Sequence, residues 1–163
     1  DFVVSFQVIE HIKQDDFFIR EIYLVLKPGG KLILTTPNRE MSITRNPWHI
    51  REYLSNELQS LIQNVFDNLE MKGVFGSDKV MKYYEANKKS VARITHFDIF
   101  NLQYKLPRQL LKIPYDLLNR FNRNKLHKTN TDTVNQVQLN DFHLSDTTDR
   151  CFDFFVVAEK KRE

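Results

Sequence analysis

The sequence predicts one α/β domain with a mainly parallel sheet. Two short, almost continuously apolar runs, at residues 2–6 and 31–36, are typical of strands buried on both faces. A helical apolar pattern at residues 14–26 separates them, and Lys27-Pro-Gly-Gly30 ends that helix. Strand, helix and strand in this order predict a βαβ unit with parallel strands and a right-handed crossover.

Later patterns predict the rest of the sheet and a long insertion. Residues 77–149 are far longer than a usual connection, so we expect a helical insertion there. Its tail, 129–149, is rich in Asn, Thr and Asp and predicts a mobile loop. The other expected elements are a helix at 57–65, strands at 68–75 and 151–159, and insertion helices near 78–89, 95–104 and 107–122, the last kinked at Pro114.

Composition places the chain among globular proteins. Its 163 residues are 41% hydrophobic and 28% charged, which argues against disorder. No run approaches the roughly 18 apolar residues of a membrane span. The single cysteine, Cys151, excludes an intrachain disulfide and fits a cytoplasmic location. The first residues lack an initiator Met and a signal peptide and look like a strand entered partway, so we expect a truncated N-terminus.

Positive charge is concentrated in residues 105–128. This segment holds seven Lys or Arg against one Asp, whereas the whole chain has a net charge of only +3. Such a distribution gives poor support for nucleic-acid binding. The segment is also amphipathic, and three roles stay open: a substrate lid, a plain cover packed on the domain, or a weak contact with an anionic membrane surface.

Three motifs resemble class I S-adenosylmethionine (SAM)-dependent methyltransferases. Residues 1–12, DFVVSFQVIEHI, resemble the fourth-strand motif of that family, and residues 26–38, LKPGGKLILTTPN, resemble its helix-to-fifth-strand motif. Their order and spacing fit the family as well. Residues 46–53, NPWHIREY, resemble the bacterial small-molecule and sugar-methylating branch. The resemblance covers residues 1 to about 76 and the final strand.

The resemblance implies a Rossmann-like sheet whose last strand runs antiparallel to the others. The chain would supply strands four to seven, the C-terminal portion of one methyltransferase domain. Residues 1–76 and 151–160 would form its sheet core, and 77–149 a helical insertion before the last strand that serves as a substrate lid. The glycine-rich cofactor loop and the ribose-binding acid of the family are absent from this sequence. We therefore expect the chain alone to bind SAM weakly.

The resemblance also suggests where cofactor and substrate bind. Ligands of open α/β sheets lie at the carboxyl ends of the strands. By family analogy, Ser5, Phe6 and Gln7 would line the methionine end of SAM, and Asn38 would lie beside the substrate. No metal is expected, because Gln7 stands where some quinone-pathway O-methyltransferases have an acidic ligand three positions before a Glu-His pair.

Two histidines are candidate general bases, since imidazole titrates near neutral pH. His11 follows the first strand and His49 the second. The alternative for Glu10 and His11 is a structural role in the turn, and for His49 a packed loop anchored on Trp48. The candidate substrate-binding residues are Asn38, Trp48, Arg51 and Tyr53.

We therefore expect methyl transfer from SAM to a small molecule, most favourably to a hydroxyl of a sugar, glycolipid or quinone-like phenol. The alternatives are a non-catalytic Rossmann-like interaction protein without a cofactor loop, and a dinucleotide-dependent oxidoreductase. The oxidoreductase is disfavoured because Glu10-His11 and Lys27-Pro-Gly-Gly30 have no role in it. The acceptor, the methylated atom and the oligomeric state do not follow from the sequence.

Overall fold

The computed structural model describes residues 1–96, 102–135 and 137–162, which form two compact units. The sheet unit comprises Asp1–Ser42, His49–Phe75 and His143–Glu163. The helical unit comprises Ile43–Trp48 and Gly76–Phe142. Among the described residues, no helix combines the length and apolar character that crossing a membrane requires.

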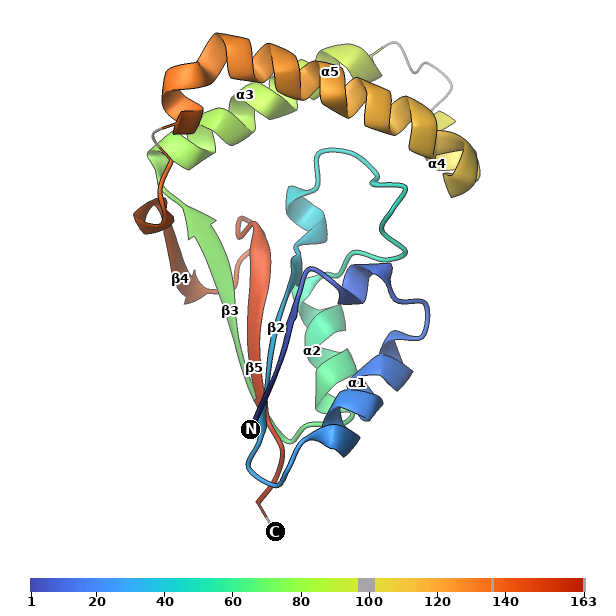
Figure 1. Cartoon of the computed structure of the whole chain (residues 1–163), viewed down its shortest axis with the longest axis vertical. Helices are drawn as coiled ribbons and strands as arrows, with labels where there is room; N and C mark the ends of the chain where they lie inside the picture. The colour runs from blue at the N-terminus through green and yellow to red at the C-terminus, as the bar shows by residue number, and fades with distance from the viewer. Residues whose placement is uncertain (97–101, 136, 163) are drawn as a thin grey trace. The chain divides into compact units, whose positions relative to one another are not determined.

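The sheet has five strands in the order β1-β2-β5-β3-β4 (Figure 1). β1 (Phe2–Phe6) runs parallel to β2 (Lys31–Pro37), with Val4 opposite Ile33. β5 (Asp153–Glu159) lies between β2 and β3 (Asn68–Gly76) and is antiparallel to both. The predicted α/β class and the antiparallel final strand are therefore confirmed.

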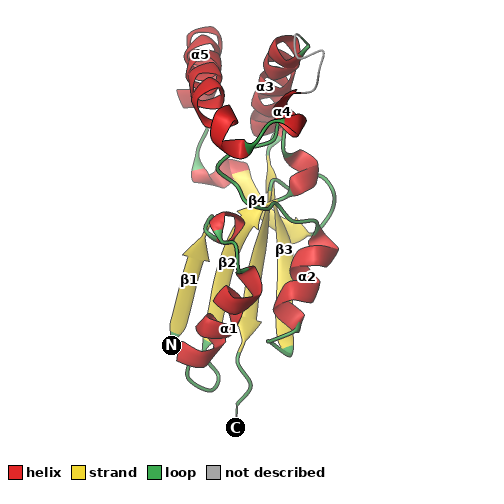
Figure 2. Cartoon of the chain, turned by 90° about the vertical axis from the view of Figure 1, so that its right-hand side faces the viewer, coloured by secondary structure: helices red, strands yellow, loops and turns green. Residues whose placement is uncertain are grey.

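One face of this sheet is covered by two helices (Figure 2). α1 (Asp15–Val25) connects β1 to β2, as predicted, and α2 (Ser55–Gln63) precedes β3. Burial along β2 and β5 alternates, because successive side chains of a strand point to opposite faces. The buried set of these four elements forms the core: Ile19, Ile22, Leu32, Leu34, Leu58, Ile62, Phe154, Val156 and Ala158.

The prediction that the first strand is buried on both faces is wrong. Phe2, Val4 and Phe6 of β1 are 54–66% exposed, whereas Ser5 on the other face is buried. In the described part of the sheet unit, α1 and α2 lie on the same face, and no helix of that unit packs on the opposite one (Figures 1 and 2).

Two glycines are required by local geometry. Gly29, in the turn between α1 and β2, has φ +75, a conformation that residues with a Cβ rarely adopt. Gly73 of β3 lies directly against β5. A Cβ added to Gly73 would be 2.5 Å from the Cβ of Cys151, so a larger residue would force the strands apart. Cys151 itself is fully buried.

The expected mobile loop at 129–149 is also a wrong prediction. The helix α5 (Arg108–Asn135) continues through Pro114 and well beyond the predicted end. A 3-10 turn and the edge strand β4 (Phe142–Asp146) follow. All five β4 residues are exposed, so the strand lacks the apolar alternation by which a strand is predicted. Lys72 contacts Asp146 at 2.9 Å, and Phe75 stacks on His143, which fixes β4 to the sheet unit.

The insertion otherwise contains helices where the sequence predicts them. α3 (Asp78–Thr95) is longer than expected, and α4 (Leu102–Lys105) covers the end of the predicted helix at 95–104. Residues 97–101 of that prediction lie outside the described residues. α3 and α5 pack against each other within the helical unit (Figure 1).

Candidate functional site

The carboxyl edge of the parallel strand pair brings together most of the predicted site residues. Ser5 and Phe6 are the last residues of β1, and Gln7 follows directly. Ser5 is 6% exposed, and within the described residues its hydroxyl oxygen has no hydrogen-bond partner. Phe6 is half exposed on the opposite face of the strand. A buried hydroxyl without a partner is costly, so Ser5 is suited to bind a polar ligand atom.

Gln7 turns the chain sharply at the end of β1. Its φ is 55, in the left-handed region, and its backbone N–H donates to the carbonyl of Thr35 at 2.9 Å. Its side-chain amide donates to Asp153 Oδ1 at 3.1 Å. A non-glycine residue with positive φ is uncommon, and such strain often occurs at functional sites.

Asp153 is a candidate that the sequence analysis missed. It begins β5, and because β5 is antiparallel to β2, this beginning lies beside the end of β2. Burial raises the pKa of the Asp153 carboxyl. The hydrogen bond from Gln7 opposes this effect, and the charge of Glu10 adds to it. Only the pairing of β2 with β5 reveals this position, and no local motif marks it.

Glu10 anchors the loop that carries the second histidine. Its carboxylate is 1% exposed and accepts a hydrogen bond from the Thr36 hydroxyl at 3.0 Å. Its backbone carbonyl accepts from the N–H groups of Ile50, at 2.7 Å, and Arg51, at 3.2 Å. The turn after β1 is thereby tied to the segment 49–53 that follows β2.

This connection brings the two predicted histidines into contact. The rings of His11 and His49 meet edge to face, with their centroids 4.9 Å apart. His11 Nε2 is 4.0 Å from a carboxylate oxygen of Glu10. Glu10, His11 and His49 each offer one ligand atom within 4.8 Å of the others, so this cluster could also hold a metal ion. Two imidazoles and one carboxylate suit zinc or iron better than magnesium.

Glu52 orients His49. Its Oε1 is hydrogen-bonded to His49 Nδ1, and its Oε2 accepts from the Ser42 hydroxyl. Burial raises the pKa of Glu52, but the hydrogen bonds from His49 and Ser42 together with the charges of His49 and Arg39 outweigh it, so the pKa is lowered. An ionised Glu52 favours the tautomer with its proton on Nδ1 and the lone pair on Nε2.

Three of the predicted substrate residues make structural contacts. Tyr53 is fully buried and donates to Asp15 Oδ2 at 2.7 Å; burial and Asp15 raise the pKa of its hydroxyl. Arg51 pairs with the same Asp15 oxygen at 3.1 Å. Asn38 accepts from the N–H of Glu40 and donates to the carbonyl of Cys151 at 2.9 Å. These contacts fix the loops around the carboxyl edge.

Trp48 belongs to the helical unit. Its indole N–H donates to Asp116 at 3.0 Å, and the Lys112 amine lies over the Trp48 ring, 3.9 Å from the ring centroid. Trp48 therefore packs with α5, as an anchored loop would.

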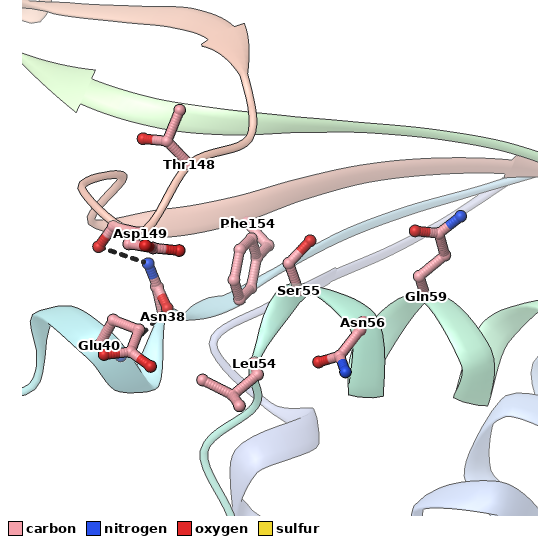
Figure 3. A pocket seen from close by; sticks show the side chains of 9 residues that line it. All are labelled: Asn38, Glu40, Leu54, Ser55, Asn56, Gln59, Thr148, Asp149 and Phe154. Atoms are coloured by element: carbon pink, nitrogen blue, oxygen red, sulfur yellow. Dashed lines mark hydrogen bonds between the residues drawn. The ribbon is translucent and has the colours of Figure 1, made fainter.

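A pocket of about 310 Å³ opens beside the start of α2 (Figure 3). Asn38 lines it, with Glu40, Ser55, Asn56, Gln59 and other residues from the same part of the sheet unit. Its lining contains neither His11 nor His49. We favour the carboxyl-edge cluster as the candidate site, because it combines a strained backbone, buried carboxyl groups and two histidines.

This geometry defines an α/β protein with a candidate ligand site at the carboxyl edge of its sheet. Residues 1–34 match the family model described as a methyltransferase domain. A probable SAM-dependent methyltransferase of Mycolicibacterium smegmatis is 40% identical over 81 residues, which are 46% of this chain and 32% of that protein. The mitochondrial ubiquinone biosynthesis O-methyltransferase of Rattus norvegicus is 49% identical over 39 residues, 24% of this chain and 11% of that protein.

These matches agree with the predicted resemblance to SAM-dependent methyltransferases in the first part of the chain. The chain spans about a third of the length of the mycobacterial relative and less of the rat protein. Among solved structures, a phosphoethanolamine N-methyltransferase of Haemonchus contortus in complex with SAM is similar, with a TM-score of 0.46 and 20% identity over 99% of this chain and 33% of that one.

Proposed function

We propose that the protein transfers the methyl group of SAM to a small-molecule acceptor. The observation that carries this proposal is the match of residues 1–34 to a methyltransferase domain. That segment runs from β1 through α1 into β2, and β1 ends at the candidate site. The name of the rat relative supports a phenol of the quinone type as one acceptor; a hydroxyl of a sugar or glycolipid is the other.

The residues at the end of β1 fit a polar cofactor. Ser5 offers a buried hydroxyl that lacks a partner among the described residues, and the sharp turn at Gln7 brings backbone groups to the edge. We propose that Ser5, Phe6 and Gln7 hold the methionine end of SAM. Bound there, SAM would supply an electrophilic methyl group, which a positioned nucleophile can attack in line.

His49 is the general base of this proposal. With Nδ1 held by Glu52, its Nε2 carries the lone pair that can accept the proton of an acceptor hydroxyl. His11, in edge contact with His49, is the second candidate for this role. Arg51 and Tyr53 would act mainly through the loop they fix. A lid role for residues 77–149 stays a prediction.

The test is methyl transfer by the protein expressed from its complete reading frame. Labelled SAM is incubated with phenol and sugar acceptors, and SAM binding is measured by calorimetry. His49→Ala should lower kcat/KM about 10²- to 10⁴-fold, the usual contribution of a general base, and leave SAM affinity unchanged. His143→Ala is the control, since His143 lies on β4, at the sheet edge opposite β1.

Each result has a distinct meaning. Failure to bind SAM would contradict the proposal and favour the non-catalytic interaction protein. Methyl transfer that survives in His49→Ala would retain the methyltransferase and remove His49 as the base. Loss of transfer in His11→Ala alone would assign that role to His11.

A further inference from the structure

The helix α5 has three distinct sides. One side packs on α3, where Asn122 is 6% exposed, accepts from the Ser90 hydroxyl at 2.6 Å and donates to Asn87 at 2.7 Å. A second side contacts the loop 43–48 through the Trp48 ring, which lies against Lys112 and Asp116. These contacts fix how the helix is rotated within the helical unit.

The third side is apolar and exposed. Leu110, Ile113, Leu117 and Phe121 are 64%, 74%, 54% and 71% exposed. Their spacing of three and four residues puts them in one strip along the helix. This strip points away from α3, because Asn122 and its helical neighbours Leu111, Tyr115 and Asn119, which are less exposed, form the opposite side. Four large apolar side chains in one open row exceed the scattered exposure that is normal for a protein surface.

The charges of the segment that carries this strip are mainly positive. Residues 105–128 contain seven Lys or Arg and a single acid, Asp116. That acid is engaged by the indole N–H of Trp48. Arg120 is exposed and lies beside Ile113 on the helical wheel, and Lys105 is exposed just before the helix. A contact between two copies through this strip would bring two basic surfaces together, which is unfavourable.

We propose that the α5 strip, Leu110, Ile113, Leu117 and Phe121, is a binding surface for an anionic lipid membrane. The helix would lie in the plane of the interface, with the apolar strip in the headgroup and acyl boundary and the bases near lipid phosphates. This inference goes beyond the proposed methyl transfer and does not depend on it.

Vesicle flotation of the purified protein tests this surface, because aggregated protein sediments and does not float with the vesicles. We expect binding to phosphatidylcholine vesicles that contain phosphatidylglycerol, weaker binding to pure phosphatidylcholine, and weakening by salt. The double variant Leu117→Ser with Ile113→Ser should bind about tenfold less or weaker still, because two apolar side chains leave the interface. The matched control is Leu24→Ser with Val25→Ser, which are 68% and 72% exposed on α1 and should bind as the wild type does.

A charge variant keeps the test independent of helix packing. Arg120→Glu preserves the apolar strip and should weaken binding to anionic vesicles while leaving binding to neutral ones unchanged. The proposal is overturned if the wild type does not bind anionic vesicles, or if the α5 and α1 double variants bind equally. A third result would also overturn it: the wild type binds no vesicles but forms a dimer, and the α5 double variant is monomeric. The strip would then join two copies.

Discussion

Tyr53 connects two segments beside the candidate site through hydrogen bonds. Its hydroxyl donates to Asp15 at the start of α1, and its backbone carbonyl accepts from the N–H of Arg39 at 3.0 Å after β2. The side chain is fully buried. One residue therefore holds the beginning of α1 and the loop after β2 in a fixed relation.

Tyr53→Phe should lower the free energy of unfolding by about 1–2 kcal/mol. The change removes the Tyr53 hydrogen bond to Asp15, whose carboxylate keeps Arg51 and the backbone N–H of Asp16 as partners, while the ring still fills its site. Urea denaturation measures the effect. Tyr104→Phe, at a tyrosine that is 62% exposed, is the control and should change stability by less than about 0.5 kcal/mol. Equal stabilities of the two variants would contradict the role of the Tyr53 hydroxyl.

Glu52→Gln should change the tautomer of His49 without unfolding the loop. Glutamine can still contact Nδ1 and Ser42, but it loses the negative charge that favours a proton on Nδ1. Nitrogen-15 NMR of the imidazole should report mainly Nδ1–H in the wild type and a mixture in the variant. In the transfer assay, the rate should fall about tenfold or more, with SAM affinity preserved. An unchanged tautomer would remove Glu52 from the proposed mechanism.

At the level of elements, α2 depends on its first turn. Glu57 accepts a hydrogen bond from the backbone N–H of Leu54 at 3.0 Å and pairs with Arg39 at 3.1 Å. The backbone hydrogen bond is the main cause that lowers the pKa of Glu57; burial opposes it, and Arg39 lowers the pKa further. The carboxylate thus satisfies a donor at the N-terminus of the helix and interacts with its dipole.

Glu57→Ala should destabilise the protein by about 0.5–1 kcal/mol near pH 7. Because the folded pKa lies below the unfolded value, this contribution is complete above the ordinary glutamate pKa of 4.5 and disappears as the pH falls through the folded pKa. Urea unfolding at pH 7 and near pH 3 should therefore show a difference between variant and wild type that shrinks on acidification. Glu57→Gln keeps a hydrogen-bond acceptor, so its free energy of unfolding should lie between those of Glu57→Ala and the wild type. A difference that grows at low pH would contradict this account.

The elements also differ in how well sequence predicts them. β1, α1 and β2 follow from apolar runs and a Pro-Gly-Gly stop, which are local signals. β4 could not be predicted because no residue in it is buried. The end of α5 was missed because Asn and Thr favour loops, and packing of the helix on α3 overrides that preference. The same contrast between local signals and tertiary contacts applies to the candidate site. His11 and His49 were predictable from the motifs that contain them, whereas the position of Asp153 follows only from strand pairing.

For the whole molecule, the first strand is the weak point. β1 is an edge of the sheet, and it also exposes Phe2, Val4 and Phe6 on its face. An apolar strand with unpaired backbone groups promotes association. The other edge, β4, has the same length but places His143, Ser145 and Asp146 beside its apolar side chains, which hinders such pairing.

The isolated chain of 163 residues should therefore aggregate at micromolar concentrations. Val4→Lys should reduce aggregation, because an exposed lysine on an edge strand blocks pairing with a second copy. Light scattering during incubation at constant ionic strength measures the extent of aggregation. Leu144→Lys on β4 is the control, since Leu144 is similarly exposed on the other edge. A wild-type chain that remains monomeric, or equal effects of both lysines, would contradict this localisation.

Because Gly73 packs closely against Cys151, the rate at which Cys151 reacts can report how often this part of the sheet opens. Cys151 is the single thiol of the chain, and burial raises its pKa, although hydrogen bonds with Thr148 and Asn38 partly offset this. A disulfide reagent can reach such a thiol only when the start of β5 separates from β3. The modification rate in the native state, set against the rate in urea, therefore gives the free energy of that opening. Ligands that stabilise the carboxyl edge should slow the reaction, so thiol exchange can screen for them without a label.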